Sequence, residues 1–262
     1  MPLDSALLLH IFLLVLGAAM IVGLYFGLKN KSAKVQTVVL GALSFSGIAA
    51  VIYNLLMWGS PLEYLPLHLC SINALLLPVT VWTRSKTMGN LLLLWSLGAL
   101  LALVVNREMM SLTYGFWTLF FYYFPHVMEF GIPILLFKLG FVEKTPKCIG
   151  PTIGLTVIFY TVIHLINKGI NAWCAFAGIM SGDKLLQVNY MYSIVPEFPP
   201  LDLFYKLIPY EYWYMYLAFP MVAVYLLAVY APELIRAKKG AKAAVKLKFP
   251  CRRSGFLPKR HV

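Results

Sequence analysis

Seven apolar runs, most of them close to 20 residues long, restrict what this chain can fold into. A helix needs about 20 consecutive apolar residues to cross the ~30 Å hydrocarbon core of a bilayer. The chain is 61% hydrophobic and 12% charged, against about 25% charged in a soluble domain, so a soluble globular fold is excluded. We predict an all-α polytopic membrane protein with seven transmembrane helices. The runs are 7–28, 37–57, 66–82, 90–105, 114–137, 148–166 and 212–230.

The basic residues alternate between loops as the positive-inside rule requires. With the N-terminus outside, the inside segments hold 18 of the 22 Lys and Arg residues, and the outside segments hold four, namely Arg107, Lys168, Lys184 and Lys206. We therefore predict a transmembrane domain over 1–231, with its N-terminus outside, and a basic cytoplasmic tail over 232–262. The net charge of +12 then points to anionic lipid of the inner leaflet, bound by the tail, and not to nucleic acid.

A long connection, 167–211, separates the last two predicted helices. Loops of this length are usually functional or disordered, and its many aromatic residues argue against disorder. We expect a folded outer loop. The four cysteines show no C-x-x-C spacing, which predicts neither a zinc site nor a disulfide framework, and no cofactor is indicated; they are Cys70, Cys148, Cys174 and Cys251.

The third run opens with His68, Cys70 and Asn73 at its outer end. Residues three apart share a helix face, so Cys70 and Asn73 can line one groove. An alternative is that Cys70 is a small packing residue beside an interfacial histidine, as free cysteines often are.

The fifth run carries the stronger functional signal. His126 and Glu129 are three residues apart and therefore neighbours on one helix face, next to Pro125. Ionisable groups inside the membrane are costly and are candidates for function. A carboxylate beside an imidazole is an arrangement that suits a general base, although a packing hydrogen bond between helices is the alternative.

A third histidine, His164, lies near the outer end of the sixth run and is followed by Asn167 and Asn171. The third, fifth and sixth runs all present their histidines on the same predicted side. We therefore expect His68, Cys70, His126 and His164 to converge in the outer half of the bundle. An interfacial role for His164, bonded to loop backbone, is the alternative.

These same segments resemble the transmembrane protein 164 family, especially its small bacterial YwaF-like branch. The resemblance is carried by the segments Leu-Pro-Leu-His-Leu-Cys at 65–70 and Tyr-Tyr-Phe-Pro-His-Val-Met at 122–128, by His164 with Asn167 and Asn171, and by Asn-Tyr-Met-Tyr at 189–192. In animal members the thiol directly precedes the histidine. Here that position is Leu67, and the thiol stands three residues later at Cys70, on about the same helix face.

The resemblance implies a membrane-embedded lipid acyltransferase in a bacterial cytoplasmic membrane, in which a cysteine and a histidine from different helices act together on phospholipid and lysophospholipid. By analogy Cys70 is the nucleophile and His126, oriented by Glu129, is the base. Seven further residues are then expected to bind substrate, with the asparagines as possible donors to an oxyanion. They are His68, Asn73, His164, Asn167, Asn171, Asn189 and Tyr190.

Two other functions remain open from the residues alone. A small-molecule or proton-coupled transporter, or a lipid-binding protein, would also use an intramembrane His and Glu, although no second repeat matches the fifth run. A metal site built from His68, His126, Glu129 and His164 has suitable residue types, but the H-E-x-x-H spacing is absent.

Overall fold

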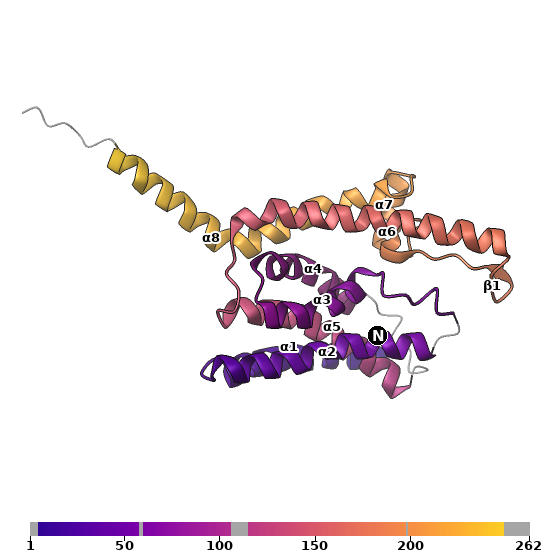
Figure 1. The fold of residues 1–262 in the computed structure, drawn as a ribbon, viewed down its shortest axis with the longest axis horizontal. Helices are drawn as coiled ribbons and strands as arrows, with labels where there is room; N and C mark the ends of the chain where they lie inside the picture. The colour runs from indigo at the N-terminus through magenta and orange to yellow at the C-terminus, as the bar shows by residue number, and fades with distance from the viewer. Residues whose placement is uncertain (1–4, 58–59, 106–114, 198, 249–262) are drawn as a thin grey trace, which may run out of the picture.

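The computed structural model describes residues 5–57, 60–105, 115–197 and 199–248, and within them the chain is almost wholly helical (Figure 1). The longer helices are α1 (Ser5–Leu28), α2 (Ala33–Met57), α3 (Leu69–Thr83), α4 (Lys86–Val105), α5 (Phe116–Lys138), α6 (Ile149–Ala177) and α8 (Phe219–Lys248). The smaller elements are the 3-10 turns η2 (Pro146–Cys148), η3 (Tyr190–Tyr192) and η4 (Trp213–Ala218), the short helix α7 (Pro199–Leu207), and the strands β1 (Met180–Ser181) and β2 (Lys184–Leu185).

Six helical segments in the described part of the chain are long and apolar enough to cross a membrane. They are α1, α2, α4, α5, η2 with α6, and η4 with the first part of α8. The remaining predicted span forms α3, which has 15 residues and is shorter than the ~30 Å hydrocarbon core. The predicted class, an all-α polytopic membrane protein, is confirmed.

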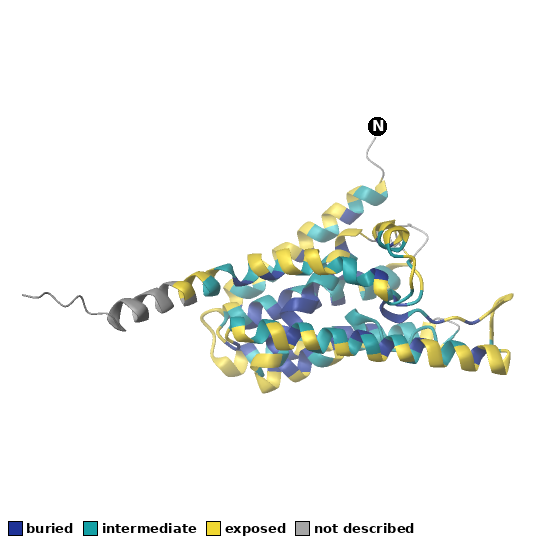
Figure 2. Cartoon of the chain, turned by 90° about the horizontal axis from the view of Figure 1, so that it is seen from above, coloured by how far each residue is buried: buried dark blue, intermediate teal, exposed yellow. Residues whose placement is uncertain are grey.

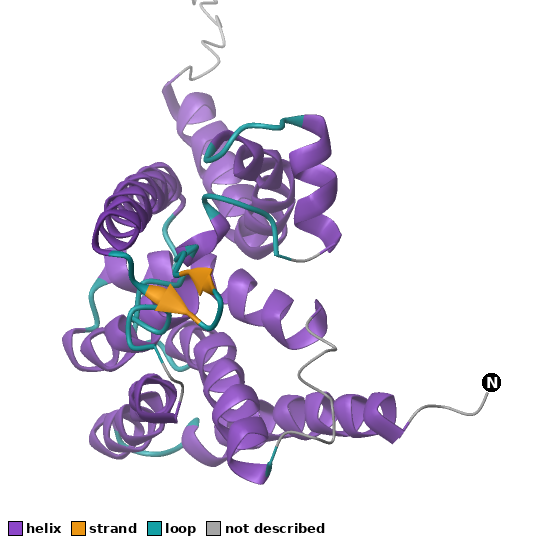
Figure 3. Ribbon diagram, turned by 90° about the vertical axis from the view of Figure 1, so that its right-hand side faces the viewer, coloured by secondary structure: helices purple, strands orange, loops and turns teal. Residues whose placement is uncertain are grey.

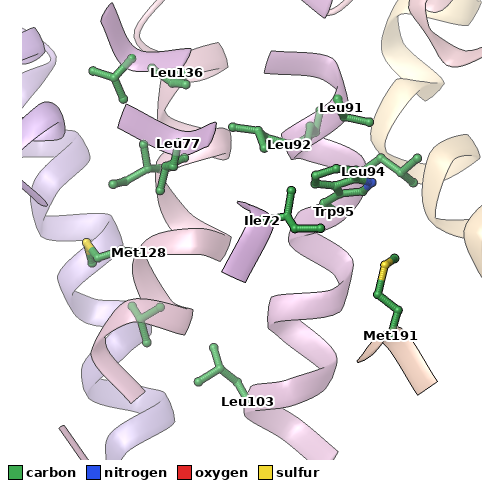
Figure 4. Packing of buried hydrophobic residues seen from close by; sticks show 14 of the residues in the cluster. Ile72, Leu77, Leu91, Leu92, Leu94, Trp95, Leu103, Met128, Leu136 and Met191 are labelled. Atoms are coloured by element: carbon green, nitrogen blue, oxygen red, sulfur yellow. The ribbon is translucent and has the colours of Figure 1, made fainter. Parts of the chain in front are cut away.

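The bundle has an inner and an outer set of helices. In α4 and α5, 56% of the most apolar window is buried, whereas in α1 and in the last span only 11% is buried. Figure 2 shows the buried residues gathered in the middle of the bundle. Figure 4 shows members of this buried cluster from three helices, among them Leu77 of α3, Trp95 of α4 and Met128 of α5. The outer helices expose apolar side chains, as helices that face lipid do.

The loops rich in Lys and Arg meet at one end of the bundle, which we call the basic end. Lys86, at the start of α4, forms an ion pair with Glu143 at 2.9 Å, and Lys144 forms one with Glu233 of α8 at 3.3 Å. The connections 60–68 and 178–212 lie at the opposite end, which we call the loop end and which faces the viewer in Figure 3.

Glycines allow neighbouring helices of the bundle to pack closely against each other. A Cβ placed on Gly47 of α2 would lie 2.5 Å from the Cβ of Ala74 in α3, and one on Gly131 of α5 would lie 2.6 Å from Ile21 of α1. Both distances are too short for real atoms, so the helices approach as closely as they do only because no side chain is present. Small residues serve this purpose at many membrane helix interfaces.

Gly47→Ala should therefore destabilise the protein by about 1–3 kcal/mol, because the new methyl group forces α2 and α3 apart. Ala74→Gly in the same chain should restore most of the loss, because it removes the atom that clashes. Gly23→Ala is the matched control, since nothing lies within 4 Å of a Cβ there. Unfolding midpoints in detergent would measure this, and equal midpoints for Gly47→Ala and Gly23→Ala would contradict it.

Several predicted boundaries differ from the structure. The last span was predicted to end at residue 230, but α8 continues to Lys248, and α4 begins at Lys86 and not at residue 90. The outer loop was expected to begin at residue 167, but α6 continues to Ala177 and ends at Gly178, which adopts a left-handed conformation (φ 66°). The asparagines that indicated a loop are helical and bind loop backbone instead. The predicted third helix began at residue 66, whereas α3 begins at Leu69. Arg107, Cys251 and tail residues 249–262 lie outside the described residues.

Candidate functional site

The first turn of α3 lies inside the bundle and not at its loop end. Ala74 stands nine residues before the end of α3, and Glu129 stands nine residues before the end of α5, so both lie about 13 Å from the basic end. From this level α5 extends about 20 Å further toward the loop end, whereas α3 extends only about 8 Å in that direction. The start of α3 is thus about 12 Å short of the start of α5.

Cys70 lies in this first turn. The thiol is followed in the chain by Ser71, and it interacts electrostatically with Glu129 of α5 and with Tyr192 of η3. The first amides of a helix have no partner inside the helix and carry the positive end of its dipole. The position of Cys70 in this first turn therefore favours negative charge on the sulfur.

His68 directly precedes α3 and contacts η3. Its Nδ1 accepts a hydrogen bond from the backbone amide of Met191 at 3.3 Å, and its ring centroid lies 5.3 Å from that of Tyr190 and 5.6 Å from that of Tyr192. Because Nδ1 is an acceptor here, Nε2 carries the proton of the neutral ring. His68 therefore helps to attach η3 over the start of α3.

His126 presents the opposite tautomer. Its Nδ1 donates to the carbonyl oxygen of Tyr122, one turn earlier in α5, at 2.6 Å, so in the neutral ring Nε2 is the nitrogen that can accept a proton. Glu129 interacts electrostatically with His126. No described residue hydrogen-bonds to Oε2 of Glu129, a side chain that is only 3% exposed.

Two asparagines of α6 hold the loop that follows the hairpin. Asn171 exchanges hydrogen bonds with the backbone of Val188 at 2.7 and 3.0 Å, and Asn167 does so with Tyr190 at 2.8 and 3.1 Å. Four residues of helix rise about 6 Å, and two residues of extended chain span about 6.6 Å. The two spacings match, so the amides pair with the loop as a neighbouring strand would.

Ser193, which the sequence analysis did not single out, connects α6, η3 and the segment before η4. Its hydroxyl accepts a bond from Asn167 at 2.9 Å and lies 3.1 Å from Nδ1 of His164, and its carbonyl accepts from the amide of Tyr212 at 2.8 Å. Its side chain is fully buried. His164 also lines an open groove of about 690 Å³ that includes Tyr212.

The side chains of Asn189 and Tyr190, the remaining predicted residues, also form hydrogen bonds at the loop end. Asn189 donates to the carbonyl of Val195 and to Glu197, each at 2.7 Å. Burial raises the pKa of the Glu197 carboxyl in spite of the bond from Asn189, which lowers it. Burial likewise raises the pKa of the Tyr190 hydroxyl to about 12, and this hydroxyl donates to the carbonyl of Leu62 in the α2–α3 connection.

Three non-glycine residues near the site have positive φ angles, which cost energy. Met191 (φ 54°) and Tyr192 (φ 53°) are consecutive in η3. Tyr212 (φ 66°, ψ −49°) is the centre of a γ-turn closed by the bond from the Trp213 amide to the Glu211 carbonyl at 2.7 Å. The contacts from α6 and Ser193 hold these conformations.

Asn167→Leu should loosen the loop without unfolding the bundle. The change leaves the amide and carbonyl of Tyr190 without partners and costs about 2 kcal/mol locally, which corresponds to a roughly thirtyfold larger open population. Amide hydrogen exchange over 188–195 would measure it. Thr152→Val is the control, because Thr152 is also buried in α6 and its hydroxyl bonds only within its own helix in the part of the chain that the structure describes. Equal exchange in both variants would contradict the anchoring role.

The structure thus divides the predicted residues into two groups. One lies at the start of α3 or interacts with it: His68, Cys70, Asn73, Glu129 and Tyr190. His126 is linked to this group through Glu129, and among the described residues its ring forms no hydrogen bond to Cys70. The other, on α6 and its loop, holds the loop backbone: His164, Asn167, Asn171 and Asn189. The described residues contain no group of three His, Cys, Asp or Glu side chains that could hold a metal ion, so the metal alternative finds no support among them.

The six apolar spans found among the described residues define a multi-pass α-helical membrane protein. The chain belongs to the TMEM164 family, whose model matches residues 3–229 and so covers α1 to α7, η4 and the first part of α8. All the residues of both groups lie within this match. No curated protein and no solved structure matches the chain.

Proposed function

We propose that the chain is a membrane-embedded acyltransferase that moves an acyl chain from a phospholipid to a lysophospholipid through a thioester on Cys70. The observation that carries the proposal is the position of the thiol. It lies in the first turn of a helix that begins inside the bundle, where the first helix amides favour negative charge, and it interacts electrostatically with Glu129. A thiol in apolar surroundings needs such donors and a base in order to react.

In the first step Nε2 of His126 accepts the thiol proton, and the sulfur of Cys70 attacks the carbonyl carbon of the donor ester. The bond between this carbon and the glycerol oxygen breaks, and that oxygen takes the proton from His126. In the second step an acceptor hydroxyl attacks the thioester carbon, the carbon–sulfur bond breaks, and the hydroxyl proton returns to the sulfur. In the first step Glu129 stabilises the imidazolium of His126, after it has accepted the thiol proton and before it gives that proton to the glycerol oxygen.

The donor that we propose depends on membrane orientation. We infer seven crossings, with α3 as a short third one, the N-terminus outside and the basic end inside, where the tail contacts anionic lipid. The ion pairs that gather Lys86 and Lys144 at one end support this orientation. In a bacterial cytoplasmic membrane the site would then face away from acyl-CoA, so a phospholipid is the donor. A Lys184→Cys variant that reacts only with thiol reagents from the cytoplasm would contradict it.

Incubation of the purified protein with a phospholipid that carries a labelled acyl chain tests the proposal. Label should bind to the protein and be released by neutral hydroxylamine, which cleaves thioesters. Cys70→Ala and His126→Ala should both lack it. Folded parent protein that stays unlabelled with several lipid classes would contradict the proposal and favour transport or lipid binding instead.

A further inference from the structure

Two buried polar side chains next to Cys70 have unused hydrogen-bonding groups. Glu129 is 3% exposed and Asn73 is 1% exposed. Among the described residues, none hydrogen-bonds to Oε2 of Glu129 or to Oδ1 or Nδ2 of Asn73. A buried polar group without a partner costs about 1–3 kcal/mol, so three such atoms in one region indicate a polar ligand.

These side chains lie on facing helices at one level of the bundle. Asn73 stands one turn after Cys70 on the same face of α3. Its neighbour Ala74 packs against Gly47, and a Cβ on Gly47 would lie 3.4 Å from Oε1 of Glu129. Glu129 in turn interacts electrostatically with Cys70. Cys70, Asn73 and Glu129 therefore border a common region between α3 and α5.

The unused groups include both a donor and acceptors, which limits the chemistry of the ligand. The amide Nδ2 of Asn73 can only donate, whereas its Oδ1 and the carboxylate of Glu129 can accept. A cation would leave Nδ2 without a partner, and an acyl chain would leave all three atoms without one. A neutral hydroxyl group satisfies both kinds of atom, because it donates one hydrogen bond and accepts others.

We propose that Asn73 and Glu129 form the acceptor subsite, which binds the hydroxyl of the lysophospholipid beside the acylated Cys70. This inference rests on the proposed acyl transfer. Nδ2 of Asn73 donates to the hydroxyl oxygen, and the hydroxyl donates to the carboxylate of Glu129. When the oxygen attacks the thioester carbon, its proton passes to Glu129 and from there to the sulfur that leaves. The first step, which forms the thioester, does not use Asn73.

A single-turnover experiment separates the two steps. The protein is first labelled on Cys70 from a phospholipid donor, and the loss of label is then followed after addition of lysophospholipid. In Asn73→Leu the labelling rate should stay within about threefold of the parent, whereas the loss of label should slow about 100-fold, so that acylated protein accumulates. Glu129→Gln should slow the loss of label at least as much.

Thr80→Val is the matched control, because Thr80 is a buried polar residue of α3 whose hydroxyl bonds, among the described residues, only to the Leu76 carbonyl of its own helix. It should leave both rates unchanged. Labelling of Cys70 also reports that each variant is folded. An unchanged loss of label in Asn73→Leu, or an equal slowing of both steps, would overturn the acceptor subsite alone. Parent protein that never labels would overturn the proposed function, and this inference with it.

Discussion

Cys70→Ser should reduce acyl transfer to lysophospholipid about 10⁴-fold or more, to the level of the protein-free reaction. Serine is close in size to cysteine, so the fold at the start of α3 should be preserved. Its hydroxyl ionises far less readily than a thiol and is a poor nucleophile unless a base activates it strongly. Conversion of labelled lysophospholipid to phospholipid in mixed micelles that contain an unlabelled donor phospholipid would measure the effect.

Cys148→Ala provides the control for this variant. Cys148 lies in η2 at the basic end, away from the first turn of α3, so its removal should leave transfer within about twofold of the parent, as surface changes away from a site usually do. Retention of more than about a tenth of the activity in Cys70→Ser would mean that the thiol is not the nucleophile.

His126→Gln should lower transfer about 10²–10⁴-fold at neutral pH, because the thiol loses the base that takes its proton. The remaining activity should rise about tenfold for each pH unit, since hydroxide then removes the proton from the thiol. The activity of the parent protein should not show this tenfold rise per pH unit near neutral pH. The rate of transfer as a function of pH distinguishes a base from a packing residue, because loss of packing would lower the rate equally at every pH.

His10→Gln is the corresponding control. His10 is a buried histidine of α1 whose Nδ1 lies 2.9 Å from the hydroxyl of Tyr123 in α5. Its loss removes a buried hydrogen bond without touching the start of α3. It should lower stability by about 1 kcal/mol and leave the pH dependence of transfer like that of the parent. An identical pH profile in His10→Gln and His126→Gln would contradict the role of His126.

The class of the fold could be predicted from the sequence because apolar length alone selects membrane-spanning helices. The length of α3 could not. Its apolar run is no different in composition from the others, and the helix starts late because His68 and the preceding residues contact η3, which is more than 100 residues away in the chain. Such a contact has no signature in a local pattern.

The polar residues of α6 show the same limit. Asn167 and Asn171 are poor helix formers, so their presence indicated the end of the sixth helix. In the structure they are four residues apart on one helix face, and that spacing lets both bind the backbone of an extended loop. The buried His10 of α1 also has a distant partner, because its Nδ1 lies 2.9 Å from the hydroxyl of Tyr123 in α5. In each case a tertiary partner, and not the residue itself, determines the outcome.

The pairing of His126 with Glu129 was predictable, since helix periodicity alone makes residues three apart neighbours. Their relation to Cys70 required the three-dimensional structure. It depends on the close approach of α2 to α3 at Gly47, which brings the carboxyl group of Glu129 and the first turns of α3 to the same region. A single glycine in an apolar helix does not indicate such a contact.

The proposed function requires that an acyl chain is carried on Cys70. Mass spectrometry of the protein, quenched in acid after brief incubation with donor phospholipid, detects such an adduct. We expect the peptide containing Cys70 to gain the mass of one acyl chain, hydroxylamine to remove this mass, and added lysophospholipid to deplete it. An acyl chain found on Cys148 or Cys174 instead, or no adduct while lysophospholipid is still being acylated, would show that Cys70 does not carry the acyl chain.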